Sequence, residues 1–546
     1  MVENVFEAKL FDELEALYPD SDIAMGVKHY EVAATNGTYA GVHIMMEALQ
    51  PGMPITIQVN GPHKKYKLME LLAVPVEVNS GYESRAESVD NKFNTNVIRR
   101  APFMVYDALK QFGNIVTAKG VTAALAFRCK VEVNEYCNQP WEIEITHCGI
   151  TRKLMFVVEA FTTCVPKAGK DTHKYVNWFS SDTLEINHNT VKFSDRWYRI
   201  FENYLKLANY GRQNMLTISA DILFDYEAGG MPKFNEKRID RIIELANKYG
   251  MYWLTGGDIV TRKEWEAVTL ETCFGGLPIP GEGENLLKYM CKEIYNYVES
   301  RRLKDRWMQS LMDEPLDFSA EAFKLGSEIL HKAMPGIPLL DASIARETIA
   351  GAIDIWCPTV DKYEKYIDFF KGRAACNDRF FVYTCLQPTG PHCNRLLDME
   401  RLRAVWLGWA PAKYTDIEGF LHWGANWFGG EGMEGIWGTF EPFYNAGGQG
   451  HITDYDLDKY NRLPAGDGAI MYPGHCEALS SARLEAHRIG LEDLYLLEEL
   501  KKKDTERALQ LIDMVFRGYA DFEKSVDKYR DVRQMLLKEL ELDGSR

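Results

Sequence analysis

The chain has 546 residues, of which 46% are hydrophobic and 26% charged, as in a soluble globular protein of two or three domains. Its formal net charge of −16 disfavours nucleic acid as a partner, because phosphate backbones repel an acidic surface. No window approaches ~18 uninterrupted apolar residues, so the sequence predicts no membrane span.

The N-terminus and the cysteines bear on the compartment. Residues 1–9 lack the basic start and apolar stretch of a signal peptide. The 11 Cys are scattered, odd in number and form no Cys-x-x-Cys pair, a pattern typical of reduced thiols. We therefore expect a cytoplasmic protein, unless a leader was trimmed from this chain.

The first part of the chain alternates with a period of two. Ile55, Ile57 and Val59 alternate with polar residues, and residues 125–133 and 141–145 repeat the pattern. Turn signals such as Asn-Gly at 36–37 and 60–61 separate these runs. The pattern predicts half-buried strands that assemble into a β-sandwich domain over residues 1–172.

Near residue 175 short apolar strands begin to alternate with amphipathic helices. Gly211, Gly250, Gly336 and Gly372 each follow a helical run, where a left-handed residue commonly ends a helix. Eight strand–helix units predict a (β/α)8 TIM barrel over residues 173–478. The expected strands lie at 175–178, 215–218, 251–254, 307–312, 338–341, 353–356, 380–383 and 419–423.

Residues 479–546 are strongly helical and charged, which predicts a C-terminal helical extension. Its mixed charge runs are typical of solvated helix faces. Arg483 with Glu485 or Glu492 is expected to form a buried or half-buried ion pair that docks the extension.

The most informative motif is Asp313-Glu314-Pro315, at the end of the fourth expected strand. Residues at the C-terminal ends of barrel strands carry the chemistry of this fold. Pro315 favours an extended Glu314. Two neighbouring carboxyl groups oppose each other's ionisation, so one should keep its proton more tightly and could act as a general acid. The alternative is that the acids only cap the next helix.

A retaining glycosidase normally needs a second carboxylate about 5 Å away as nucleophile. The seventh strand, residues 380–387, supplies no acid. Adjacent acids are poorly placed on opposite faces of one ring. A 2-acetamido sugar avoids the need, because its own carbonyl oxygen can attack the anomeric carbon. One carboxylate then orients the amide N–H, and its neighbour protonates the leaving oxygen.

Four segments together resemble glycoside hydrolase family 123: Asp313-Glu314-Pro315, residues 419–427 (GFLHWGANW), residues 464–474 and residues 481–493. The resemblance spans about residues 175–497. It implies a β-sandwich joined to a (β/α)8 barrel, and a β-N-acetylgalactosaminidase or a close β-N-acetylhexosaminidase that works by substrate-assisted retention. By that resemblance Asp313 orients the acetamido group and Glu314 is the acid/base.

Other residues near the expected strand ends are candidates for sugar contacts. Trp423 could stack on the sugar or belong to the core, and Tyr383 could donate to the acetamido oxygen or to another partner. The remaining candidates are Trp178, Asn177, Trp356, His422, Asn426 and Asp467, for which structural roles are the alternative. No metal-ligand spacing or phosphate loop occurs, so no cofactor is predicted.

Two other functions stay open at this point. One is a barrel glycosidase for a non-acetamido sugar, with Asp341 or Asp258 as nucleophile. The other is a non-catalytic glycan-binding protein. In each case the expected partner is a glycan, and the sequence makes no prediction about oligomeric state.

Overall fold

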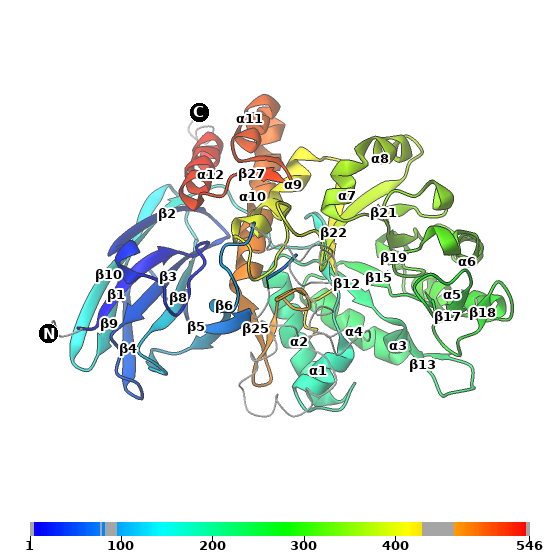
Figure 1. Ribbon diagram of the computed structural model, residues 1–546, viewed down its shortest axis with the longest axis horizontal. Coiled ribbons are helices and arrows are strands. Elements are labelled where there is room, and N and C mark those ends of the chain that lie inside the picture. Colours follow the sequence, from blue (N-terminus) through cyan, green and yellow to red (C-terminus); the bar gives the residue numbers. More distant parts are fainter. Residues whose placement is uncertain (1–4, 77–78, 82–95, 428–463, 542–546) are drawn as a thin grey trace.

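The computed structural model describes residues 5–76, 79–81, 96–427 and 464–541. It comprises a β-rich N-terminal region and an α/β region, with helix α10 (Ala482–Lys503) between them (Figure 1). None of the helices in these ranges combines the length and the apolar character needed to cross a bilayer.

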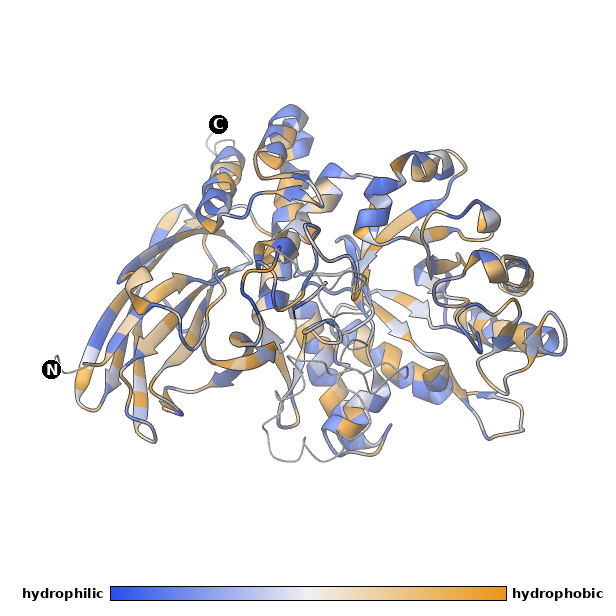
Figure 2. Cartoon of the chain, viewed as in Figure 1, coloured by the Kyte–Doolittle hydropathy of each residue, from blue (hydrophilic) through white to orange (hydrophobic). Residues whose placement is uncertain are grey.

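Two sheets build the β-rich region, in the strand orders β1-β3-β8-β5-β6-β25-β24 and β2-β10-β9-β4-β7. The inward residues of both sheets share one hydrophobic core, and Figure 2 shows the alternation of apolar and polar residues along these strands. Ile55, Ile57 and Val59 are buried as the alternation predicts. The bounds are β1 (Glu7–Asp12), β2 (His29–Thr35), β3 (Tyr39–Glu47), β4 (Pro54–Asn60), β5 (Tyr66–Val76), β6 (Phe103–Phe112), β7 (Ile115–Thr117), β8 (Ala123–Lys130), β9 (Cys137–His147), β10 (Ile150–Phe161), β24 (Tyr472–Pro473) and β25 (Ala478–Ser481).

Eight short strands run parallel in the α/β region, and their positions in the chain are close to those expected from the sequence. They form a five-stranded sheet, β11-β23-β22-β21-β20, and a three-stranded sheet, β12-β15-β19. A parallel bridge between Gln309 and Leu339 joins the sheets on one side, and the Asn214 N–H donates to the Tyr175 carbonyl on the other. The strands are β11 (Lys174–Asn177), β12 (Met215–Ile218), β15 (Trp253–Gly256), β19 (Trp307–Gln309), β20 (Leu340–Ala342), β21 (Ile355–Cys357), β22 (Arg379–Thr384) and β23 (Ile417–His422).

Amphipathic helices follow these strands. In α4 the buried residues Ile239, Ile242, Ile243 and Ala246 recur with helical spacing. The helices are α1 (Ser181–Asn187), α2 (Asp195–Tyr210), α3 (Ala220–Leu223), α4 (Glu236–Lys248), α5 (Gly283–Ser300), α6 (Ala320–Ala333), α7 (Val360–Lys365), α8 (Ile367–Ala374) and α9 (Leu402–Lys413). Short strand pairs interrupt the pattern: β13 (Phe224–Asp225) with β14 (Lys233–Phe234), and β17 (Leu270–Thr272) with β16 (Val260–Thr261) and β18 (Pro278–Ile279).

Two of the four glycines expected to end helices do so in the left-handed conformation. Gly250 and Gly336 have φ of 73° and 80°. Gly211 instead has φ of −71°, and Gly372 lies inside α8. At Gly211 the helix ends as predicted, but the left-handed residue is Arg212, with φ of 77°. At Gly372 the prediction was wrong, because the helix continues to Ala374.

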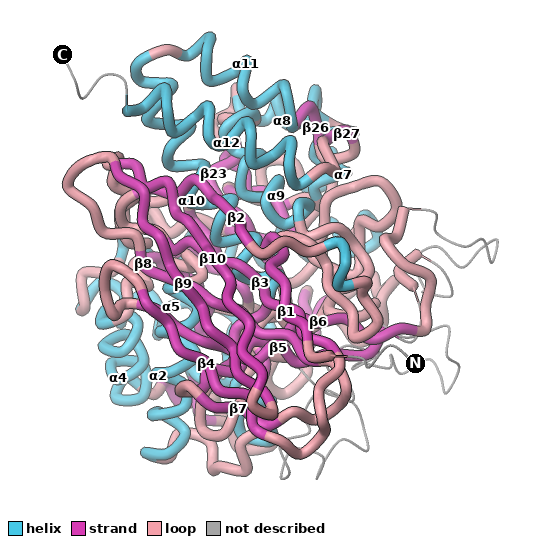
Figure 3. The backbone as a smooth tube through the Cα atoms, turned by 90° about the vertical axis from the view of Figure 1, so that its left-hand side faces the viewer, coloured by secondary structure: helices cyan, strands magenta, loops and turns pink. Residues whose placement is uncertain are grey.

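The C-terminal region contains α10, α11 (Thr505–Val515) and α12 (Val526–Glu541), with the short strands β26 (Phe516–Gly518) and β27 (Asp521–Phe522) between the last two. Figure 3 shows α11 and α12 above the sheet β2-β10-β9-β4-β7 of the N-terminal region. The predicted boundary at 172/173 falls between β10 and β11. The one at 478/479 falls inside β25, which pairs with β6 of the N-terminal region.

Residues 482–494 of α10 are buried, so their charges are not a solvated face as the sequence suggested, whereas Lys502 and Lys503 at the end of the helix are exposed as expected. Arg483 pairs with Asp107 of β6 at 2.9 Å, not with the predicted glutamates. Glu485 and Glu492 pair with Arg488 at 3.0 and 2.7 Å. The correction has a physical reason: a buried charge requires a partner, and the nearest one comes from another region of the chain.

Candidate active site

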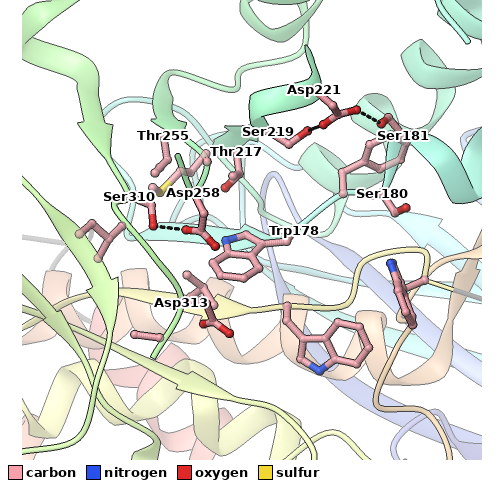
Figure 4. Close-up of a pocket in the computed structure, with 18 of the residues that line it drawn as sticks. Trp178, Ser180, Ser181, Thr217, Ser219, Asp221, Thr255, Asp258, Ser310 and Asp313 are labelled. Carbon is pink, nitrogen blue, oxygen red and sulfur yellow. Dashed lines mark hydrogen bonds between the residues drawn. The ribbon is translucent and has the colours of Figure 1, made fainter. Parts of the chain in front are cut away.

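A cavity of about 350 Å³ opens at the C-terminal ends of the parallel strands. Trp178 follows β11, Ser219 follows β12, Asp258 follows β15, Asp313 follows β19 and Trp423 follows β23. This is the edge at which α/β folds place their ligands. The other lining residues are Phe179, Ser180, Ser181, Asp182, Met215, Thr217, Asp221, Thr255, Gly257, Ser310, Leu340, Ala342, Leu421 and Trp427 (Figure 4).

The backbone of the acidic pair is held by a neighbouring arginine. The Arg262 guanidinium donates to the carbonyl oxygens of Glu314 and Asp313, at 2.8 and 3.0 Å. Glu314 has φ of 44°, a left-handed conformation that is uncommon for residues other than glycine. The extended conformation expected from Pro315 is therefore wrong. The guanidinium clamp stabilises a strained backbone at the strand end, as functional sites often do.

Asp313 is the member of the pair that faces the cavity. Its side chain is exposed to the cavity. Desolvation by the walls of the cavity, together with the charges of Glu314 and Asp258, raises the pKa of Asp313 from 3.8 to about 8, while Arg262 opposes the shift. Asp313 therefore keeps its proton at neutral pH in the empty cavity.

The Glu314 carboxylate accepts a hydrogen bond from the Tyr383 hydroxyl of β22. Tyr383 is buried, and the Glu314 charge helps to keep its hydroxyl protonated by raising its pKa. The sequence predicted that this hydroxyl reaches a sugar acetamido group. In the structure its partner is the acid itself, so Tyr383 orients Glu314.

Aromatic side chains form one wall of the cavity. Trp178 and Trp423 both line it, as the sequence predicted, and Trp427 packs edge-on against Trp423 with ring centroids 5.3 Å apart. The Trp423 indole N–H donates to Asp467 at 3.2 Å. Asp467 is fully buried behind this ring, and burial raises its pKa to about 7. It therefore anchors Trp423 and does not line the cavity.

Four other candidates lie away from the cavity. Asn177 exchanges hydrogen bonds with Gln213 and Arg395, and the Trp356 indole donates to Asp378 among the helices. His422 accepts the Gly424 N–H, and burial holds its pKa well below the usual value. Asn426 pairs with the backbone of Ser180 through both amide atoms. Because successive strand residues face opposite sides, the sequence could not tell which would point to the cavity.

The polar wall of the cavity was not expected from the sequence. Asp221 accepts hydrogen bonds from Ser181 and Ser219, and Lys192 pairs with both Asp221 and Asp182. In Figure 4 this cluster lies on one side of Trp178, and Asp258, Ser310 and Asp313 lie on the other. Two lining residues outside the predicted sugar contacts had a sequence signal: Trp427, which follows Trp423 in the same aromatic motif, and Asp258, which the sequence offered as a possible nucleophile.

A carboxyl group that faces an aromatic wall at strand ends, with a second acid beside it in the chain, is a feature of enzymes that cleave glycosidic bonds, the glycoside hydrolases. A family model supports this class: the catalytic domain of glycoside hydrolase family 123 matches residues 178–500, more than half of the chain. The chain therefore belongs to glycoside hydrolase family 123. No curated protein sequence matches it.

Among solved structures, the fold is similar to that of a family 123 glycoside hydrolase from Clostridium perfringens. The TM-score is 0.72 at 13% identity, covering 99% of this chain and 98% of that chain. The β-D-glucuronidase of Dictyoglomus thermophilum reaches a TM-score of 0.35 at 9% identity, covering 84% and 69% of the two chains, and supports no argument. Within the described residues, no cluster of His, Cys, Asp and Glu could hold a metal ion.

Proposed function

We propose that this glycosidase releases terminal β-linked N-acetylgalactosamine with retention, through a substrate-assisted oxazolinium intermediate. The observation that carries the proposal is the position of Asp313 and Glu314, which lie side by side on one strand end. We further propose that the eight parallel strands act as a (β/α)8 barrel, whose rim presents this pair to the sugar.

In the first step the acetamido carbonyl oxygen of the sugar attacks C1, and the bond from C1 to the leaving oxygen breaks. Glu314 donates its proton to that oxygen. Asp313 accepts a hydrogen bond from the acetamido N–H and balances the positive charge of the oxazolinium ring. Placing both carboxyl groups on one side suits this division of work, because the nucleophile belongs to the substrate.

In the second step water attacks C1 from the face that the leaving group vacated. Glu314 takes a proton from the water, the ring C–O bond of the oxazolinium breaks, and the acetamide is restored. The two inversions give net retention. Glu314 ends protonated and is ready for the next cycle.

The protonation of the empty site is compatible with these roles. In the empty cavity Asp313 keeps its proton up to about pH 8, and the Tyr383 hydroxyl donates to Glu314. An acetamido N–H docked on Asp313 favours its ionised form. The proton then moves to Glu314, where the first step needs it.

The size of the cavity supports a single terminal sugar. About 350 Å³ lies at the small end of the range for ligand pockets. The Clostridium perfringens relative is described for glycolipid glycan hydrolysis, which supports a glycolipid-type glycan among the substrates of this protein.

Chromogenic glycosides test the proposal. Wild type should cleave the β-N-acetylgalactosaminide, be inhibited by the corresponding thiazoline, and act poorly on the β-galactoside, which lacks the acetamide. Glu314→Gln should lose about 10²–10⁴-fold with a poor leaving group and far less with a dinitrophenyl one. Asp313→Asn should lose activity with both. Glu321→Gln, an exposed position on α6, is the matched control.

One observation favours a second candidate. Asp258 lines the same cavity and could serve as the nucleophile of a non-acetamido glycosidase. Robust turnover of the plain β-galactoside, with a fluorosugar trapped covalently on Asp258, would establish that function and overturn the substrate-assisted one.

A further inference from the structure

Three polar residues from neighbouring strands meet beneath the catalytic pair. Asp258 follows β15, Ser310 follows β19, and Asp341 lies in β20. The Ser310 hydroxyl lies within hydrogen-bond distance of carboxylate oxygens of both Asp258 and Asp341, at 2.5 Å for Asp341. The serine thus bridges two carboxyl groups whose residues lie far apart in the chain.

The bridge requires a stored proton. A serine hydroxyl has one hydrogen and can donate to only one carboxylate. The other carboxyl group must therefore donate a proton of its own to the serine oxygen. If both carboxyl groups were ionised, the single hydroxyl hydrogen could serve only one of them. The serine oxygen would then face the other carboxylate at short distance with no hydrogen between them.

Burial decides which carboxyl group holds the proton. Asp341 is 2% exposed, whereas Asp258 touches the cavity. Although burial raises the pKa of Asp258, Arg262 and hydrogen bonds from Ser310 and the Asp313 N–H oppose that rise. Ionising the enclosed group costs more because water cannot solvate its charge. Burial and the Asp258 charge raise the pKa of Asp341 well above its usual value, although the Leu311 and Met312 N–H groups donate to it.

We propose that Asp341 donates a stored proton to Ser310, that Ser310 donates to Asp258, and that the resulting Asp258 anion is a positioning residue that controls the charge of Asp313. Asp258 also accepts the backbone N–H of Asp313, so it holds that residue from below. The inference rests on the proposed function for the role of Asp313 in holding the acetamido group.

Other groups around these carboxyls are part of the same balance. The described groups that face Asp313 are Glu314, Asp258, Arg262, Tyr383, Cys357 and Cys385. Those that face Asp258 are Arg262, Asp313, Asp341 and Cys273. Arg262 is the cation among them, so removing the Asp258 charge should favour the ionised form of Asp313.

Two isosteric variants separate the carboxyl groups. In Asp258→Asn the amide oxygen still accepts from Ser310 and from the Asp313 N–H, but the charge is gone. In Asp341→Asn the amide NH₂ replaces the protonated carboxyl as donor to Ser310. We expect the first variant to lower the titration midpoint of Asp313 by about 1–2 pH units and the second to leave it unchanged.

The readout is ¹³C NMR of carboxyl-labelled aspartate in the substrate-free protein, with the signals assigned by Asp313→Asn and Asp341→Asn. In wild type the Asp341 signal should stay at its protonated position at pH 7, a result that does not depend on any variant folding. An ionised Asp341 at pH 7, an unmoved Asp313 midpoint in Asp258→Asn, or an equal shift in Asp341→Asn would each overturn the relay.

A kinetic arm separates this inference from the proposed function. If the protein cleaves the acetamido sugar, the alkaline limb of kcat/KM should move to lower pH in Asp258→Asn and stay in place in Asp341→Asn. If no acetamido glycoside is cleaved while the NMR shifts appear, the proposed function fails and the relay stands. If the acetamido glycoside is cleaved while the NMR signals stay unmoved, the relay fails and the proposed function stands.

Discussion

The pH dependence of wild-type activity follows directly from the acidic pair. Asp313 keeps its proton until the pH passes about 8, the pKa to which burial and neighbouring charges raise it. Above that pH Asp313 has no proton to pass to Glu314, so the proposed mechanism lacks its general acid. For one ionisation at pH 8, about 10% of kcat/KM should remain at pH 9 and about 1% at pH 10.

Initial rates with a chromogenic β-N-acetylgalactosaminide, well below KM, measure this limb from pH 6 to 10. Enzyme held at each pH and then assayed at pH 7 controls for unfolding. Glu314→Gln with a dinitrophenyl leaving group provides the matched comparison. It needs no acid, and loss of the Glu314 charge lowers the pKa of Asp313, so its rate should not fall between pH 8 and 10.

A wild-type profile that stays level from pH 7 to 10 would refute this reasoning, because the pair would then hold no proton to lose. The same decline in Glu314→Gln would also refute it. In that case the limb belongs to a group outside the pair.

Four further outcomes are expected. Arg262→Ala should lower kcat/KM about 10–100-fold, because two hydrogen bonds to the backbone of the acidic pair are lost. Trp423→Ala should raise KM and weaken inhibition by the thiazoline, because Trp423 lines the cavity. Phe318→Ala, a change at an exposed position, should do neither. Asp313→Asn should raise Tm more at pH 8 than at pH 5. The pKa of Asp313 is higher in the folded than in the unfolded protein, so wild type loses stability as the pH rises through this window, and the variant does not. Arg483→Met should lower the urea midpoint, with a loss of about 3–5 kcal/mol, because Asp107 loses one of its two buried arginine partners and the buried carbonyl oxygens of Arg395, Gly466 and Ala469 lose their donor.

Much of the secondary structure could be predicted because local patterns decide it. Period-two alternation predicted the strands around Ile55 and Trp141, and both residues are buried. The helix with Ile239, Ile242 and Ala246 on one face is present as α4. These patterns report which side of an element is buried, and a fold rarely overrides them over a whole element.

The acidic pair was also found from sequence, since it ends a strand whose apolar run is unmistakable. The wall residues were harder to predict. Trp178 and Trp423 line the cavity, whereas Trp356 packs outward among the helices. Strands that are buried on both faces are apolar at every position, so their sequence does not tell inside from outside.

By itself the sequence determined the order of strands and helices, the place of Asp313 and Glu314 at a strand end, and the motifs of glycoside hydrolase family 123. Tertiary structure alone decided what charge each acid carries. Asp258 and Asp341 are 52 and 31 residues from the Ser310 that joins them. The proton affinity of a carboxyl group depends on burial and on charges within a few ångströms, and residues far apart in the chain supply both.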